Sequence, residues 1–474
     1  MKWERFDPLP FFSLFGADIF VAESVRCFGL FASKSNRVLS CRTCNRDKLA
    51  FAVTIKQAIE LLVLLRLRLD PRGLAAKCCA LSTGWELFMQ VTETIKYVGV
   101  NDHDIDLFEG QYDVRENGMA YNSYVVIGEK VAVADTVDAH FVDEWMHNVE
   151  TALDGRTPDY LVVHHMEPDH SAGIVVFMDR YPEAQVVASK MAFKMMAAYF
   201  GTDFSDRQIV CKEGFELDLG GRTLRFIGAA NVHWPEVMFS YDSQDKVLFS
   251  ADAFGKFGAN DIEDPEGWAC EARRYYFGIV GKFGKNVQAV LKKVAALDVE
   301  CICPLHGPVL SENLTYYVET YTTWAHYEPE NSGVTIAYAS VYGHTKQAAE
   351  ELACVLREKG ETVSLFDLAR DDMAEAVEDA FRYDRLVLAS ITYAGDIFPF
   401  MTTFIHTLAE HAYQNRKVAF IESGTWAPVA AKAMRAQVEQ MAGIKFAETV
   451  VTVRGSVDEA ARAQIAALAN ELSE

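Results

Sequence analysis

The chain of 474 residues has little positive charge, few cysteines and no long apolar run. It carries 45 Lys and Arg against 67 Asp and Glu, and the net charge of -22 argues against nucleic acid as a partner. The ten cysteines follow no regular spacing, which argues against a disulfide framework and indicates a reducing, cytoplasmic setting. The most apolar stretch, Leu61 to Leu65, is far shorter than the roughly 20 residues of a membrane helix, so we expect no membrane partner.

The first 88 residues differ in composition from the rest. They carry 13 Lys and Arg against 8 Asp and Glu, whereas the remaining 386 residues carry 32 against 59. Glu4 and Asp7 interrupt any basic region of a signal peptide. Cys41 and Cys44 could form half of a zinc or rubredoxin-type site, but no second Cys-x-x-Cys pair follows. We expect residues 1–88 to be an N-terminal extension that is not native or is disordered, with an amphipathic membrane anchor as the alternative.

Metal-binding side chain types are concentrated where an apolar run ends. We predict a strand from Tyr160 to Val163 and a helix from Ala172 onward, with Pro168 keeping the residue before it extended. Between them, six residues contain four candidate ligands: His165, Glu167, Asp169 and His170. We expect Asp169 or Ser171 to cap the helix. Two imidazoles and two carboxylates in one small buried volume require cations to compensate the charge. A polar loop with incidental histidines is the alternative.

Three more residues of ligand type follow apolar runs downstream, namely His233, Asp252 and His306. The end of a strand is a place where a scaffold can hold a side chain rigidly. Seven ligands are too many for one ion and suit two ions that share a bridging carboxylate. The sequence therefore predicts a dinuclear metal site.

The pattern H-x-E-x-D-H, followed by His, Asp and His, resembles the metallo-β-lactamase fold in its flavodiiron, or A-type flavoprotein, form. The segments 231–236 and 250–255 also resemble this family around its ligands. Hydrolases of the fold have His where this chain has Glu167, and the added carboxylate favours redox-active iron over zinc. The resemblance implies one iron at His165, Glu167 and His233, a second at Asp169, His170 and His306, and Asp252 as the bridge. It implies no catalytic residue beyond these ligands. His164 has no place in the pattern, and we expect its ring to be hydrogen-bonded inside the protein.

Two kinds of sheet are predicted along the chain. Hairpins at 123–134 and 215–226, with a helix over 141–153, fit the αββα metallo-β-lactamase-like sandwich that the resemblance implies for residues 89–330. A linker is predicted at 327–333 because this stretch is polar and contains Pro and Gly. Five β/α units fill residues 331–474 and predict a flavodoxin-like, doubly wound, five-stranded parallel sheet. Their strands are predicted at 334–339, 362–366, 385–391, 417–421 and 447–453, and their helices at 346–359, 373–381, 400–413, 429–442 and 457–472.

Three loops of this second domain are predicted to bind a flavin at one sheet edge. The first runs directly into a helix and consists of Ser340, Val341, Tyr342, Gly343, His344 and Thr345. It resembles the FMN-phosphate loop of flavodoxins, from which His344 departs, and a plain helix cap is the alternative. The others are Thr392, Tyr393, Ala394, Gly395 and Asp396, and Ser423, Gly424, Thr425 and Trp426. Tyr393 and Trp426 could flank the isoalloxazine ring, or they could be ordinary packing residues.

The resemblance covers residues 89–474 and implies FMN and two non-haem irons as cofactors. It implies reduction of dioxygen to water or of nitric oxide to nitrous oxide, in a head-to-tail homodimer or a dimer of dimers. A metal hydrolase of the same fold and a flavin electron carrier with a vestigial metal domain are the alternatives. The last cysteine is Cys354, so no rubredoxin-type pair follows the flavin domain. We therefore expect a separate electron donor, such as rubredoxin or a reduced deazaflavin- or NADH-linked reductase.

Overall fold

The computed structural model describes residues 90–474. The expected N-terminal extension, with its Cys41 and Cys44 pair, lies outside the described residues. Within residues 90–474, no helix has the length and apolar character needed to cross a membrane.

The first domain contains two facing β-sheets. The first sheet has six strands in the order β1 (Ile95–Tyr97), β6 (Tyr124–Ile127), β7 (Val131–Ala134), β8 (Tyr160–Val163), β9 (Gln185–Ser189) and β10 (Gln208–Cys211). The second has five strands in the order β11 (Glu216–Asp218), β12 (Thr223–Gly228), β13 (Met238–Asp242), β14 (Val247–Phe249) and β15 (Cys301–Cys303). Two small ribbons pair β2 (Val100–Asp102) with β5 (Met119–Tyr121), and β3 (Leu107–Phe108) with β4 (Tyr112–Asp113). The two predicted hairpins are confirmed as β6–β7 and β11–β12.

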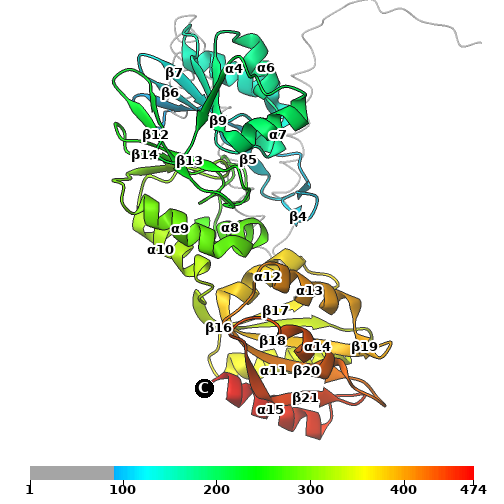
Figure 1. Cartoon of the computed structure of the whole chain (residues 1–474). Coiled ribbons are helices and arrows are strands. Elements are labelled where there is room, and N and C mark those ends of the chain that lie inside the picture. Colours follow the sequence, from blue (N-terminus) through cyan, green and yellow to red (C-terminus); the bar gives the residue numbers. More distant parts are fainter. Residues whose placement is uncertain (1–89) are drawn as a thin grey trace, which may run out of the picture. The chain divides into compact units, whose positions relative to one another are not determined.

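Helices pack on the outer faces of this pair of sheets (Figure 1). The helices on the side of the first sheet are α4 (Val142–Leu153), α6 (Ile174–Arg180) and α7 (Lys190–Phe200). Those on the side of the second sheet are α8 (Trp268–Tyr275), α9 (Gly284–Val294) and α10 (Leu314–Ala325). Between the sheets lies a buried apolar layer that includes Tyr124, Val162, Phe226 and Phe249. Along each strand these side chains alternate with side chains on the opposite face of the sheet, because successive residues of a β-strand point to opposite faces. The predicted αββα sandwich is thereby confirmed.

The helix after β8 differs from the prediction. A short helix α5 (Pro168–Ser171) begins at the proline itself, and Glu167 occupies its N-cap position without a capping hydrogen bond from its side chain. Proline is favoured at the first helical position because its ring fixes φ and the missing N–H is not needed there. Asp169 therefore lies within the first helical turn instead of capping a later helix, and the chain continues into α6 through Gly173. The turn places the Asp169 carboxylate and the His170 ring at the end of the sandwich where β8 ends.

The second domain is a parallel sheet in the order β17 (Val363–Asp367), β16 (Asn331–Ala339), β18 (Tyr383–Tyr393), β20 (Lys417–Ser423) and β21 (Lys445–Val453). Helices α11 (His344–Glu358) and α15 (Glu459–Leu472) contact one face, and α12 (Met373–Arg382), α13 (Pro399–Glu410) and α14 (Ala430–Val438) contact the other (Figure 1). This order and this distribution of helices confirm the doubly wound flavodoxin-like fold. A sixth, antiparallel strand, β19 (Asp396–Ile397), was not predicted.

Part of the predicted linker is also strand. Asn331 to Gly333 belong to β16, and Asn331 is in register with Tyr383 of β18. Gly333 lies where a Cβ atom would come within 2.3 Å of the Tyr383 ring, so glycine is needed for this close approach. The polar composition of the segment suggested a linker because its first residues are solvent-exposed.

Candidate functional site

The predicted metal-ligand side chains meet at one end of the sandwich, on the loops that follow four strands. His165, Glu167, Asp169 and His170 follow β8, His233 follows β12, Asp252 follows β14 and His306 follows β15. All seven residues are buried, and four of them, His165, His170, Asp252 and His306, have no exposed surface. Their ligand atoms fall into two groups, and within each group the atoms lie within 4.8 Å of one another.

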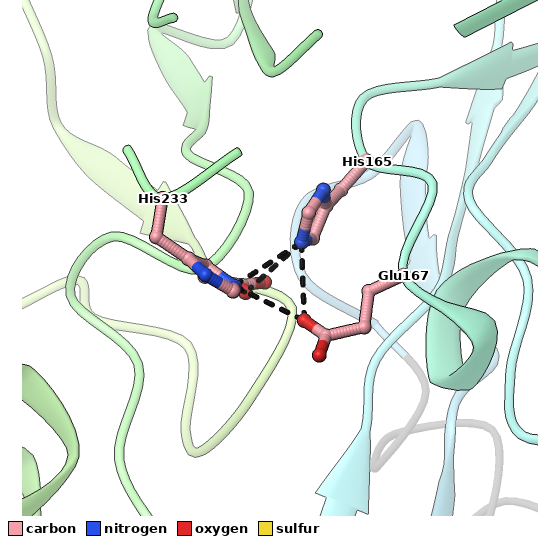
Figure 2. Close-up of side chains that lie close together, drawn as sticks. His165, Glu167 and His233 are labelled. Carbon is pink, nitrogen blue, oxygen red and sulfur yellow. Dashed lines mark hydrogen bonds and ion pairs between the residues drawn. The ribbon is translucent and has the colours of Figure 1, made fainter. Parts of the chain in front are cut away.

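The first group contains His165, Glu167 and His233, together with Asp252, which also approaches the second group. The Oε2 atom of Glu167 lies 3.2 Å from His165 Nε2 and 3.0 Å from His233 Nε2, and the two Nε2 atoms are 3.3 Å apart. Figure 2 shows the two rings and the carboxylate pointing toward one another. We call this group the His165 position.

The second group contains Asp169, His170 and His306, and we call it the His170 position. The Nε2 atoms of the two histidines are 3.0 Å apart, and Asp169 Oδ2 lies 3.4 Å from each. Asp252 lies between the groups. Its Oδ2 is 2.9 Å from His233 Nε2, whereas its Oδ1 is 3.4 Å from His170 Nε2. One oxygen of Asp252 thus faces each position, which is the geometry that a bridging carboxylate needs.

The outer ring nitrogens of two ligands donate hydrogen bonds away from the site. His165 Nδ1 donates to Glu236 Oε1 at 2.7 Å, and His306 Nδ1 donates to the carbonyl of Ala120 at 2.8 Å. A proton on Nδ1 leaves the Nε2 lone pair of a neutral imidazole free toward the interior of the site. These rings are therefore in the tautomer that binds a metal through Nε2.

His164 is not part of either group. Its Nδ1 donates to Asp135 Oδ2 at 2.5 Å, and its Nε2 lies 2.7 Å from the hydroxyl of Ser240. The ring is buried, with both nitrogens hydrogen-bonded, as predicted. It connects β7 to β13 across the two sheets, so its role is structural.

Burial and neighbouring groups shift the pKa values of the carboxyl and imidazole groups of the site in different directions. Burial raises the pKa of Asp169 well above its usual value, and the negative charge of Glu167 raises it further. Burial opposes ionisation of Asp252 too, but interactions with the neighbouring histidines, His165 first, hold the pKa of Asp252 well below its usual value. Burial lowers the pKa of His170, and the charge on His306 lowers it further. Burial likewise lowers the pKa of His306. At the other position burial is outweighed, and the nearby carboxylates, Asp252 first, raise the pKa of His165 and His233.

The ligand set fits a pair of metal ions. Among the described residues, neither carboxylate oxygen of Asp169 nor Oδ1 of Asp252 has a hydrogen-bond partner. Buried polar atoms without partners are rare and costly in folded proteins. Facing Nε2 lone pairs also repel one another unless a cation lies between them. Bound cations would remove both problems, and mixed His and carboxylate ligands suit iron.

Several residues near the site carry no motif in the sequence. Glu109, in the turn between β3 and β4, has a φ of 49° and contacts Glu167. Partial enclosure of Glu109, together with the charge of Glu167, raises its pKa to about 7. The ring centroid of Tyr275 lies 5.4 Å from that of His306, and its buried hydroxyl has no hydrogen-bond partner among residues 90–474. Sequence reasoning missed these two residues and Glu236, since only tertiary packing brings them to the ligands.

The first predicted flavin loop forms a helix N-terminus with open donor groups. Gly343 has a φ of 93° and precedes α11, and no side chain of the described part caps the helix. The Gly343 N–H donates to Ser340 Oγ at 3.2 Å, and the hydroxyls of Thr345 and Ser423 are 2.7 Å apart. Uncapped backbone N–H groups with adjacent hydroxyls suit a phosphate.

The other two loops lie on the same edge of the sheet. The second loop is the tight turn of the β18–β19 hairpin, where Ala394 and Gly395 have φ values of 52° and 79°. The third follows β20, and the Thr392 hydroxyl accepts a hydrogen bond from Val429 N–H at 2.9 Å, which ties the second loop to the segment after the third. Aromatic side chains stand out from these loops: Tyr342 is 87% exposed, Tyr393 50% and Trp426 89%. Such large exposed rings at one sheet edge fit a flat aromatic ligand.

Comparison with known proteins now identifies the family. The ODP family beta lactamase model matches residues 119–307, and a flavodoxin domain model matches residues 335–461. An uncharacterized protein of Methanocaldococcus jannaschii is 30% identical over 323 residues, or 67% of this chain and 81% of that protein. The chain belongs to the flavodiiron family. The solved structure of rubredoxin oxygen:oxidoreductase from Desulfovibrio gigas is 25% identical, with a TM-score of 0.75 over 81% of this chain and 97% of that one.

A further relative of this flavodiiron protein is the anaerobic nitric oxide reductase flavorubredoxin of Vibrio vulnificus. It is 28% identical, and the match covers 71% of this chain and 70% of the relative. The chain also spans about half the length of curated diflavin flavoproteins that it matches. The relatives with a named activity are oxidoreductases, and the pairing of a flavodoxin domain with a His and carboxylate metal group indicates FMN and a diiron centre as cofactors.

Proposed function

We propose that this flavodiiron protein reduces dioxygen to water, nitric oxide to nitrous oxide, or both, with electrons supplied through FMN. The observation that carries the proposal is the convergence of seven ligand side chains into two adjoining positions that share Asp252. The similar proteins include one named for each reaction, an oxygen oxidoreductase and a nitric oxide reductase. The chain is proposed to divide into a diiron domain at residues 89–330 and an FMN domain at residues 331–474.

The side chains of the site would have distinct tasks. The His165 position would hold one iron, the His170 position the other, and Asp252 would fix the distance between them. The chemistry that the bound groups supply is electron storage in the flavin and electron delivery at iron to a small acceptor. Ring centroids of Phe108 and Tyr275 lie 5.4 Å from that of His306, and these rings help to exclude water from that side of the site.

Tyr275 is also placed to act as a hydrogen-bond donor. Burial, and then the negative charge of Asp252, raises the pKa of Tyr275 well above its usual value, so the hydroxyl keeps its proton at neutral pH. Since this proton has no acceptor among the described residues, it is available to a reactant near His306.

The FMN is proposed to lie across the three loops at the sheet edge. The first turn of α11, with Ser340 and Thr345, would bind the phosphate through N–H and hydroxyl groups. Tyr342, Tyr393 and Trp426 would pack against the ring system. Val341, Gly343, His344, Ala394, Gly395, Asp396, Gly424 and Thr425 would supply the backbone of the cradle. Phosphate binding by helix N-termini explains why the loop needs no Lys or Arg.

Metal and flavin analysis tests the proposal. Protein purified without oxygen should contain about two irons and one FMN per chain, and its reduced form should consume dioxygen or produce nitrous oxide from nitric oxide. Asp252→Ala should lose both irons and the activity but keep FMN, because Asp252 faces both positions. The exposed Glu213→Gln variant is a matched carboxylate control in the same domain. Stoichiometric zinc without iron would support the hydrolase alternative, and FMN without any metal would support the electron carrier.

We propose a head-to-tail homodimer, because electron transfer needs the flavin close to an iron pair and the flavodiiron family brings the flavin of one chain beside the iron pair of its partner. We propose to mix an inactive His306→Ala variant with an inactive variant that combines Thr345→Ala and Gly424→Trp. A Cβ atom on Gly424 would already lie 3.2 Å from Pro428, so the bulky side chain should close the third loop. Activity should return after subunit exchange. Heterodimers proved by mass spectrometry but inactive would contradict the dimer.

We propose a separate electron donor, such as a rubredoxin or a deazaflavin- or NADH-linked reductase, since one similar protein is named for its rubredoxin. We also propose a cytoplasmic, reducing setting. The cysteines at positions 211, 270, 301, 303 and 354 are all free thiols, which supports this setting.

A further inference from the structure

One buried carboxylate outside the predicted ligand set holds a single ligand in two ways. Glu236 Oε1 accepts the Nδ1 proton of His165 at 2.7 Å and the backbone N–H of Met166 at 3.0 Å. The side chain of Glu236 has no exposed surface. The carboxylate therefore fixes both the ring of His165 and the backbone next to it.

A second carboxylate holds the preceding backbone. Asp135 Oδ1 accepts the N–H of His164 at 2.7 Å and the N–H of His165 at 3.3 Å. Three successive backbone N–H groups, at residues 164, 165 and 166, are thus bound by carboxylates from elsewhere in the fold. Hydrogen bonds to ionised acceptors are stronger than neutral ones, so this segment is unusually well fixed.

The His170 position has no comparable support. Within the described residues, His170 Nδ1 and both oxygens of Asp169 have no hydrogen-bond partner. The ring of His306 is held by the neutral carbonyl of Ala120. One metal position is therefore anchored by a buried carboxylate, whereas the other has a neutral contact to His306 and, among the described residues, no hydrogen bond to the outer nitrogen of His170 or to the Asp169 carboxyl.

We propose that Glu236 is a positioning residue that makes the two metal positions unequal, so that the His165 position holds its iron more tightly than the His170 position. The inference rests on the proposed diiron function. A carboxylate hydrogen-bonded to the outer nitrogen of a histidine ligand fixes the ring and raises its basicity, and its loss typically lowers metal affinity by about 10- to 100-fold. The second position, without such a partner, should exchange its metal more readily.

Iron release from the full-length, iron-loaded protein tests this order. The protein is reduced without oxygen and mixed with an excess of a ferrous chelator, and the coloured complex is followed over time. Two phases of equal amplitude are expected. His170→Ala should keep one iron that leaves at the slow rate, and His233→Ala should keep one iron that leaves at the fast rate.

Glu236→Gln identifies the cause of the difference. It should accelerate the slow phase by about 10- to 100-fold and leave the fast phase unchanged. Glu271→Gln is the control, since Glu271 is a partly buried carboxylate of the same domain that binds Arg274 and no proposed ligand. Circular dichroism checks that each variant is folded. If Glu236→Gln does not fold, the two histidine variants decide the order by themselves, and if those variants bind no iron, the phases in Glu236→Gln decide it.

Three results would overturn the inference. They are a single release phase in the wild type, a slow-leaving iron in His233→Ala with a fast-leaving one in His170→Ala, and equal acceleration of both phases in Glu236→Gln. The last result would show that the substitution only loosens the domain. Purified protein without iron is a different outcome, because it would refute the proposed function itself.

Discussion

Replacing Trp426 separates flavin binding from stability. Its side chain is 89% exposed, so almost none of its surface contributes to the folded domain without a ligand. Stacking of a planar heteroaromatic ring on a protein aromatic is worth about 1 to 3 kcal/mol. Because 1.4 kcal/mol corresponds to tenfold in affinity, Trp426→Ala should weaken FMN binding by about 5- to 150-fold. The midpoint of thermal unfolding of the flavin-free protein should change by no more than about 1 °C, because almost no buried contact is lost.

FMN fluorescence, which is quenched on binding, measures this affinity after the flavin has been removed by dialysis. Tyr199→Ala is the matched control, since Tyr199 is 47% exposed but lies on α7 of the other domain. It should leave FMN affinity unchanged. Unchanged affinity in Trp426→Ala would show that the ring does not contact the flavin. A large loss of stability in the flavin-free variant would show that the exposed ring has a structural role, and would refute the reasoning from exposure.

Three further predictions concern other parts of the chain. Tyr275→Phe should lower turnover at least about tenfold at unchanged iron content, because a buried hydrogen-bond donor is lost. It should also raise the free energy of unfolding by about 1 kcal/mol, because a buried hydroxyl without a partner is removed. Full activity of the variant would refute the donor role. Asp245, despite its burial, has its pKa lowered by hydrogen bonds, first from Thr92, and by Arg222. The contribution of the Asp245 carboxylate is therefore present above the unfolded pKa of about 3.9 and lost as pH falls through the lower folded value. Asp245→Asn should cost about 1 kcal/mol at pH 7 in chemical denaturation, because Asp245 is partly exposed and Arg222 keeps Asp242 as a partner at 2.8 Å. The cost should shrink in acid, and an equal cost at pH 3 would contradict this reasoning. A chain beginning at Met89 should fold, bind FMN and iron and turn over normally, and loss of solubility would argue that residues 1–88 are needed.

The sequence predicted the fold, and it predicted which side chains meet at the candidate metal site, because both leave local patterns. The alternation of strand and helix over 331–474 is a periodic signal, and the observed elements match it within a few residues. The ligands cluster in a short segment and at the ends of apolar runs, so they can be found without knowing which strands are neighbours. Boundaries were harder to predict. Pro168 begins a helix instead of preceding one, and Asn331 to Gly333 form strand instead of linker.

Only the tertiary structure determined how the ligands are supported. Asp135 and Tyr275 are many residues from the ligand they approach and lie in no recognised motif. Glu236 lies in the segment 231–236, but nothing in that segment indicates that its carboxylate contacts His165. The assignment of each ligand to one of two positions also depends on distances between loops of different sheets. Sequence periodicity reflects the local environment of a strand or helix. The partner of a buried side chain depends on how two sheets pack against each other, and that information is distributed over the whole core.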